Sequence, residues 1–113
     1  MHPKTRYLFI ASMDVAPEKE ALFNEVYDTE HIPTLLRLDG LLDVIRFRDA
    51  APNERGLLVY SALYLLARPN FHGTPEWKAA SEIGRWAPVM RPKIKARQRR
   101  AGLVVANARK PAS

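Results

Sequence analysis

The fold is decided by residues 18–48, which read EKEALFNEVYDTEHIPTLLRLDGLLDVIRFR. Apolar residues recur every three or four positions in the first part of this stretch, which predicts an amphipathic helix that begins near Pro17. Residues 41–48 alternate instead, as the residues of a strand do. Pro33 lies between the two parts and disfavours helical geometry at the residue before it. We therefore expect the helix to break or bend at His31–Ile32.

The corner between this helix and this strand gathers the side chains best able to move protons, namely Tyr27, Asp28, Glu30 and His31. His31 follows Tyr27 by four residues and Asp28 by three, so either can be its neighbour on a helix surface. An imidazole oriented by a phenol or a carboxylate is a general base that works near neutral pH. The alternative is that His31 caps the helix C-terminus, where a positive charge is favourable.

Glu30 falls in the middle of the apolar arc of the predicted helix, whereas Asp28 and His31 fall outside that arc. A carboxylate in such a place must reach solvent, pair with a cation or line a cavity. The structural interpretation is an ion pair with Arg46 or Arg48 of the next strand. The functional interpretation is an acid in a cavity, where Glu30 or Arg46 polarises a substrate.

The rest of the chain supplies the other elements of one α+β domain over residues 1–113. Strands are predicted at 5–13, 57–66 and about 99–108, and a second helix begins at Thr74-Pro75. The resulting order β-α-β-β-α-β is that of a ferredoxin-like fold, a four-stranded antiparallel sheet with both helices on one face.

The sheet face opposite the helices is expected to be uncovered, yet it is apolar in three of the four predicted strands. Each large apolar side chain left in water forgoes roughly 1.5–3 kcal/mol of burial free energy. The chain is therefore predicted to form a homodimer by packing this face on the same face of a second copy.

Two segments, FNEVYDTEHIPTLLRLDGLLDVIRF (23–47) and PEWKAASEIGRWAPVMRP (75–92), resemble the EthD-like branch of the dimeric α+β barrel superfamily. The resemblance covers the Tyr-Asp-x-x-His-x-Pro corner, an Arg-Phe pair in the following strand and a second helix with tryptophans. It implies paired ferredoxin-like units, each with a cavity between sheet and helices. The superfamily includes polyketide cyclases that need no cofactor, monooxygenases of antibiotic biosynthesis, lactone isomerases, haem-degrading enzymes and stress-responsive proteins, so the resemblance implies no single reaction.

Four aromatic residues are candidates for binding a substrate in such a cavity, namely Tyr60, Tyr64, Trp77 and Trp86. The two tyrosines lie on one face of the third predicted strand and can offer hydroxyls to a phenolic or keto group. The two tryptophans can form the walls of an aromatic pocket. Core packing is the alternative interpretation for all four.

The composition of the chain indicates which cofactors and which cellular location to expect. The chain has no cysteine, and its three histidines are dispersed, so no metal site and no cofactor are expected. Haem, with His31 or His72 as axial ligand, is an alternative by superfamily analogy only. The sequence has no apolar run long enough to cross a membrane, which favours a cytoplasmic location.

The positive charge of the chain suggests which partners it can bind. The net charge is +6, and its excess lies in residues 91–100. We expect no nucleic-acid partner, since no recognised nucleic-acid module accompanies this charge, and a basic rim that attracts an anionic small molecule is preferred. Arg91 could bind a carboxylate or lie on the surface. A basic interaction module that uses residues 91–100 remains a third alternative.

The leading hypothesis is a small-molecule enzyme that performs acid–base chemistry without a cofactor. It would cyclise, dehydrate, isomerise or oxygenate an aromatic or polyketide-like substrate, with His31 moving the proton and Tyr27 or Asp28 orienting it. The alternative is a ligand-binding or stress-response homodimer without catalysis.

Overall fold

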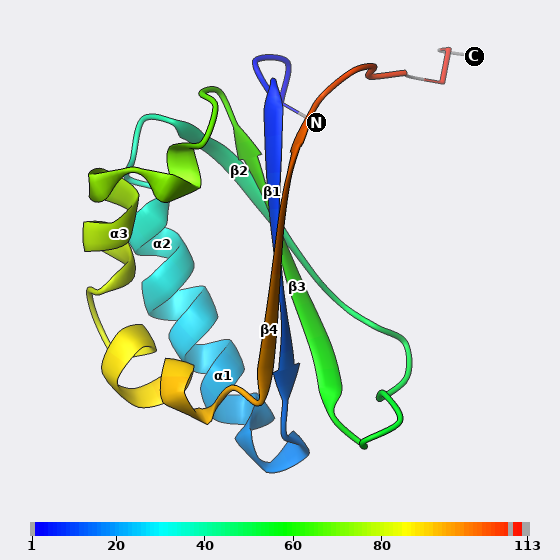
Figure 1. Ribbon diagram of the computed structural model, residues 1–113, viewed down its shortest axis with the longest axis vertical. Coiled ribbons are helices and arrows are strands. Elements are labelled where there is room, and N and C mark those ends of the chain that lie inside the picture. Colours follow the sequence, from blue (N-terminus) through cyan, green and yellow to red (C-terminus); the bar gives the residue numbers. More distant parts are fainter. Residues whose placement is uncertain (1, 109, 112–113) are drawn as a thin grey trace.

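The computed structural model describes residues 2–108 and 110–111. The predicted order of elements and the ferredoxin-like fold are confirmed. The strands are β1 (Tyr7–Val15), β2 (Leu41–Arg48), β3 (Leu58–Leu66) and β4 (Ala96–Leu103), and the helices are α1 (Glu20–Val26), α2 (Ile32–Leu35) and α3 (Pro75–Ser81). All neighbouring strands are antiparallel, in the order β2-β3-β1-β4, and the helices cover one face of the sheet (Figure 1).

The edge strand β4 differs from the prediction. It runs over Ala96–Leu103, not over 99–108 as expected, and pairs with β1 so that Arg97 lies opposite Met13 and Arg99 opposite Ala11. Its first half is basic and polar, so its own composition does not signal a strand, and the pairing with β1 determines where it begins. The first strand is likewise shifted, to 7–15 from the expected 5–13.

The first helix does not break at His31–Ile32. A π-helical turn, Tyr27–His31, joins α1 to α2, and Ile32 keeps helical angles (φ −63°, ψ −48°) although Pro33 follows it. Pro33 lacks the N–H that an α-helix would bond, and a π turn is a common place for such an irregularity. Because the helix continues past His31, the prediction that His31 caps a helix end is wrong.

The core lies between the helices and the sheet. Its largest fully buried side chains are Tyr27, Tyr64, Phe23, Phe71, Leu35, Leu65, Leu66, Met90, Val15 and Val26. Gly40, just before β2, lets the Phe71 ring approach closely, since a Cβ there would lie only 2.8 Å from that ring. The start of α3 is capped as predicted, with the Thr74 hydroxyl accepting a hydrogen bond from the Trp77 amide (3.3 Å).

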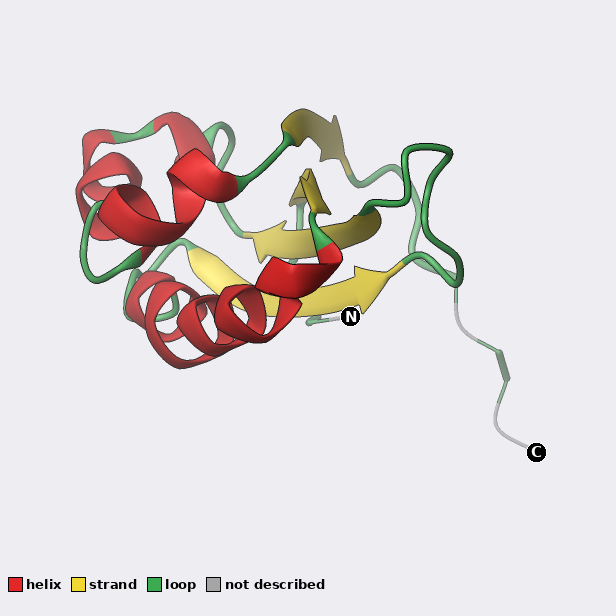
Figure 2. Ribbon diagram, turned by 90° about the horizontal axis from the view of Figure 1, so that it is seen from below, coloured by secondary structure: helices red, strands yellow, loops and turns green. Residues whose placement is uncertain are grey.

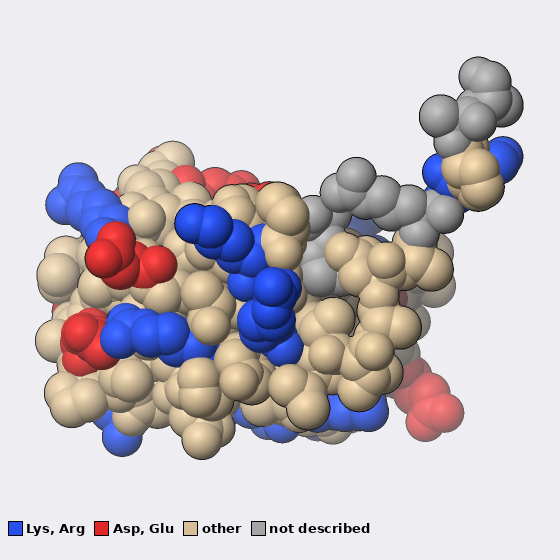
Figure 3. Space-filling model, turned by 90° about the horizontal axis from the view of Figure 1, so that it is seen from above, with Lys and Arg blue, Asp and Glu red and all other residues tan. Residues whose placement is uncertain are grey.

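The other face of the sheet carries no helix (Figure 2). Ile45 and Phe47 on β2 leave 48% and 46% of their surface exposed there, and Ile10 and Leu63 are half-buried beside them. Two further observations concern charge and membrane-spanning helices. On the end of the molecule seen in Figure 3, basic side chains lie in separate groups among uncharged ones, not in one continuous stripe. Within the described residues, no helix is long and apolar enough to span a membrane.

Candidate functional site

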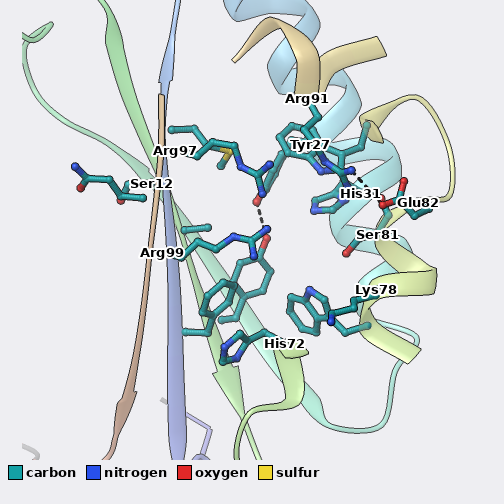
Figure 4. A pocket seen from close by; sticks show the side chains of 17 residues that line it. Ser12, Tyr27, His31, His72, Lys78, Ser81, Glu82, Arg91, Arg97 and Arg99 are labelled. Carbon is teal, nitrogen blue, oxygen red and sulfur yellow. Dashed lines mark hydrogen bonds and ion pairs between the residues drawn. The ribbon is translucent and has the colours of Figure 1, made fainter. Parts of the chain in front are cut away.

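A cavity of about 210 Å³ lies between the helices and the part of the sheet formed by β1, β3 and β4 (Figure 4). Phe9 and Met13 of β1 and Tyr64 of β3 form its floor. The helical segments supply Tyr27, His31, Trp77 and Trp86. Basic side chains from β4 and from α3 lie at its open side. The cavity is thus aromatic inside and positively charged at its rim, as suits a small organic ligand.

Two π-helical turns build the aromatic wall. The first, Tyr27–His31, buries Tyr27 and His31, and the second, Trp86–Met90, buries Trp86. A π turn holds about one residue more than an α turn, so it displaces the side chains that follow by about 100° around the axis. This displacement explains why His31, predicted outside the apolar arc, faces the core, and why Glu30, predicted in its middle, does not.

His31 is held by aromatic rings. Its side chain is 5% exposed, and its ring centroid lies 4.8 Å from that of Tyr27 and 4.8 Å from that of Trp86. None of the described residues offers a hydrogen-bond partner to its buried Nδ1. Burial, with Arg91 and Arg97 nearby, lowers the pKa of His31 to about 3. The imidazole is therefore neutral at physiological pH and has a nitrogen free to accept a proton.

A pair of tyrosines forms the polar part of the cavity interior. The Tyr27 and Tyr64 hydroxyl oxygens lie 2.5 Å apart and share a hydrogen bond. Burial raises the pKa of Tyr27 to about 12 and raises that of Tyr64 well above its ordinary value. Both phenols therefore keep their protons. One of the two hydrogens is used within the pair, and the other can be donated to a ligand.

Arg97 and Arg99 form the wall opposite the helices. They alternate with Gln98 along β4, so both face the same side of the sheet as Met13 and Ala11, and Figure 4 shows them extending into the cavity. Neither forms an ion pair or a side-chain hydrogen bond with any described residue. At the same rim, the Arg91 guanidinium pairs with the Glu82 carboxylate at 3.1 Å.

Five of the residues predicted for the site do line the cavity: His31, Tyr27, Tyr64, Trp77 and Trp86. The partners of the predicted site residues differ from the prediction. Tyr27 contacts the His31 ring, but its hydroxyl bonds Tyr64, and Asp28 is exposed and turned away to Arg46. The interpretation of Asp28 as the group that orients His31 is therefore wrong. In the described chain, packing against the tilted rings of Tyr27 and Trp86 holds the imidazole.

Glu30 and Arg46 do not line the cavity, and the predicted ion pair of Glu30 with Arg46 or Arg48 is wrong. Glu30 instead accepts hydrogen bonds from the Arg85 backbone N–H (2.9 Å) and from its Nε (2.6 Å), which lowers the pKa of the Glu30 carboxyl. It thereby ties the π turn to the loop before Trp86. The rotation caused by the π turn explains why Glu30 pairs with Arg85 and not with the strand residues Arg46 or Arg48.

Arg46 lies outside the cavity and stabilises the packing of β2 against α1. It pairs with Asp28 and donates a hydrogen bond to Asn24 (2.8 Å), and its guanidinium lies about 5 Å from three aromatic rings, those of Phe23, Tyr27 and Tyr60. It fastens β2 to α1. Tyr60 also lies outside the cavity lining, and its hydroxyl donates to Glu20 at 2.5 Å.

Several lining residues were not among the predicted site residues. Nothing in the sequence indicated Lys78 and Ser81, and Arg97 and Arg99 were recognised only as part of the basic stretch 91–100. His72 had been considered only as a haem ligand. Its ring stacks on Phe9 at 4.1 Å between centroids, and burial, with Arg99 nearby, lowers its pKa. The alternation of basic residues at 97 and 99 was a usable signal, but the strand was placed too late in the sequence for it to be seen.

A metal site is not apparent in the described residues. No group of three His, Asp or Glu among residues 2–108 and 110–111 lies close enough together to hold a metal ion. His31 and His72 both reach the cavity. Their buried Nδ1 atoms have no partner in the described chain.

The fold of this chain is similar to the folds of solved structures. No protein-family model matches the sequence, and no curated protein sequence is significantly similar to it. Among solved structures, a dimeric ferredoxin-like protein from an uncultured marine organism superposes with a TM-score of 0.70 and 17% identity, over 95% of this chain and 94% of that chain. A candidate antibiotic biosynthesis monooxygenase from Bacillus cereus superposes with a TM-score of 0.68 and 14% identity, over 96% and 99% of the two chains.

An EthD family protein from Bacillus halodurans is also similar, with a TM-score of 0.59 and 20% identity, over 86% of this chain and 96% of that one. The chain therefore has the ferredoxin-like fold that its sequence predicted. At these identities the comparison defines the fold and leaves the chemistry to the residues of the site.

Proposed function

We propose that this protein is a small-molecule enzyme that performs acid–base chemistry without a cofactor on an aromatic or polyketide-like substrate. Cyclisation, dehydration, isomerisation and oxygenation all begin with proton removal from such a substrate and fit this class. The observation that carries the proposal is the position of His31. It is a buried imidazole, neutral at physiological pH, and lines a cavity with aromatic walls across from two arginines without acidic partners.

In this proposal His31 accepts a proton from an acidic C–H or O–H group of the substrate. The negative charge that develops on the substrate oxygen is stabilised by the free hydrogen of the Tyr27–Tyr64 pair and by Arg97 and Arg99. Substrate rings pack against Trp86. An imidazole with a pKa of about 3 is a weak base on its own. A negative charge formed beside Arg97 raises its basicity by offsetting the arginine charges that oppose protonation, while burial, the larger cause of the low pKa, remains.

Proton abstraction is measured directly as exchange of the acidic C–H hydrogens of 2-tetralone, an aromatic ketone, for deuterium in heavy water. We expect the wild-type chain to accelerate this exchange and His31→Gln to reduce the acceleration at least about 100-fold, the range of a general base. His2→Gln is the matched control, because His2 is exposed and lies outside the cavity lining. Equal exchange in His31→Gln and wild type, with both variants folded, would rule out His31 as the base.

A second candidate is ligand binding without catalysis. Its support is that no carboxylate in the described chain orients His31, whose Nδ1 has no partner. For this candidate we expect a bound aromatic ligand to raise the melting temperature and to be recovered unchanged, with no acceleration of deuterium exchange in 2-tetralone.

We also propose that two copies pair through the helix-free face of the sheet. Exposed Ile45 and Phe47 lie on this face, and a similar fold occurs in a protein described as dimeric. Two copies packed there would remove these side chains from water. Light scattering of the purified chain tests the proposal: a mass of two chains supports it, and a mass of one chain at micromolar concentration contradicts it.

A further inference from the structure

Two arginines face the cavity without acidic partners. Arg97 and Arg99 are two residues apart on β4, opposite Met13 and Ala11 of β1, so their side chains project from the same face of the sheet. The acidic group at this rim, Glu82, is already paired with Arg91. Within the described chain, the charges of Arg97 and Arg99 are thus not balanced by any carboxylate in contact with them.

This arrangement leaves two like charges without a counter-charge from the described chain. Both arginines are exposed on β4, so water solvates them and an anion can replace that water. Partial desolvation, with Arg99 and Arg91 nearby, lowers the pKa of Arg97 although the residue is exposed, as expected where like charges are gathered. The other charged pairs of the protein, such as Arg48 with Glu20 and Arg85 with Glu30, join opposite charges. The cavity wall is an exception to this pattern, and its charges point toward the interior space.

A neutral donor lies beside these arginines. Both arginines are close enough to the Tyr27 phenol for their charge to act on it. The Tyr27–Tyr64 hydroxyl pair has one hydrogen left to donate, as counted above. Two guanidinium groups and one phenol O–H therefore converge on one part of the cavity (Figure 4). Such a set of donors binds an ionised oxygen group.

The rest of the cavity accepts a ring. Trp86 and Trp77 are 3% and 7% exposed, and Phe9 and His72 stack on one another at the far side. The cavity volume, about 210 Å³, lies below the range of about 300–1,000 Å³ found for most ligand pockets. A small planar ligand is favoured, and a polynucleotide backbone, which needs an open groove, is not.

We propose that Arg97 and Arg99, together with the Tyr27–Tyr64 hydroxyl pair, bind the ionised oxygen group of a small aromatic ligand whose ring packs against Trp86. This inference rests on the proposed function of the cavity and names its substrate class, an aromatic carboxylate or an acidic phenol or enol. Arg97 and Arg99 are then the residues that determine specificity for an anion over its neutral analogue.

The test is isothermal titration calorimetry with 1-naphthoate and with its neutral analogue 1-naphthamide at pH 7.5 and low salt. We expect the wild type to bind the carboxylate at least about fivefold more tightly, and both Arg97→Gln and Arg99→Gln to lose this preference, because a hydrogen bond to a charged group is worth about that much or more. The matched control is Arg55→Gln in the hairpin loop, which removes the same charge outside the cavity lining.

Equal affinity for the two naphthalenes would overturn the inference, as would a loss of preference that is no larger in Arg97→Gln and Arg99→Gln than in Arg55→Gln. Inorganic phosphate bound as tightly as 1-naphthoate would also overturn it, since the ring would then contribute nothing. The result is separable from the proposed function. If the protein prefers naphthoate but does not accelerate deuterium exchange in 2-tetralone, the anion site stands and the catalytic proposal is wrong. If it accelerates the exchange but does not prefer naphthoate, the catalytic proposal stands and the anion site is wrong.

Discussion

The low pKa of His31 follows from its neighbours. Tyr27 and Trp86 bury its ring, and the positive charges of Arg91 and Arg97 lie nearby. Burial and these charges both oppose a positive charge on the imidazole. The unfolded chain has no such surroundings, and there the histidine keeps its ordinary pKa of 6.5. Below pH 6.5 the unfolded state therefore binds a proton that the folded state rejects.

This difference predicts a pH-dependent loss of stability. Because the pKa of His31 is lower in the folded state, stability is full above pH 6.5 and falls as the pH drops from 6.5 toward 3. Between pH 7.5 and 4.5, we expect the free energy of unfolding of the wild type to fall by about 2–3 kcal/mol more than that of His31→Gln, at 1.36 kcal/mol per pH unit. Urea unfolding of both proteins at each pH measures it.

The comparison of the two proteins removes the contributions of His72 and of the carboxylates, which both retain. Parallel stability curves over this pH range would mean that His31 titrates normally and is not held neutral by burial. A naphthoate complex should shrink the difference, since an anion beside Arg97 favours the protonated imidazole.

At the residue scale, the sequence predicted which side chains have suitable chemistry for the site, but not which way each side chain points. Tyr27 and His31 were recognised by their chemistry and both line the cavity. Asp28 and Glu30 were equally plausible by chemistry, and both point elsewhere, to Arg46 and to Arg85. Helical periodicity assigned their directions, and periodicity assumes 3.6 residues per turn, which the π turn does not obey.

At the element scale, the two π-helical turns lie on either side of one ion-paired junction. Glu30 of the first turn reaches the loop before the second, where Gly84 has φ +78° and Arg85 donates two hydrogen bonds. A Cβ on Gly84 would lie 2.8 Å from the Glu30 carboxylate. This glycine therefore both permits the backbone conformation and leaves room for the contact.

Gly84→Ala should reduce the free energy of unfolding by about 1–2 kcal/mol, from the left-handed conformation alone, with a further loss where the Cβ displaces Glu30. Gly73→Ala is the matched control, since Gly73 has no atom within 4 Å of a Cβ and no positive φ. Thermal and urea unfolding of the two variants give the comparison. The account of this junction is wrong if the two alanines have the same effect.

The strands illustrate why element order was easier to predict than element ends. Residues 57–66 are apolar on both faces, which predicts a strand covered on both sides, and β3 (Leu58–Leu66) lies inside the sheet. Residues 96–98 are basic and polar, so nothing local marks them as a strand. Their conformation comes from pairing with β1, a contact between residues more than 80 positions apart, for example Met13 with Arg97.

At the scale of the whole molecule, the sheet separates two surfaces with different properties. One face carries the helices, the aromatic core and the cavity with its basic rim. The other is apolar and carries no helix, with Ile45 and Phe47 largely exposed. The sequence predicted this division, because alternation within each strand gives both faces separately. The resemblance implied a cavity between sheet and helices, but the sequence did not show which residues line it, because its walls come from segments that meet only in the folded chain.

The central claim is that this cavity binds a small aromatic anion beside a neutral His31. The most direct measurement is a crystal structure of the wild-type protein with 1-naphthoate at pH 7.5. We expect the carboxylate to lie within hydrogen-bond distance of Arg97 or Arg99, with the ring against Trp86 and His31. Naphthoate bound only outside the cavity, or inside it with the carboxylate turned away from both arginines, would contradict the account.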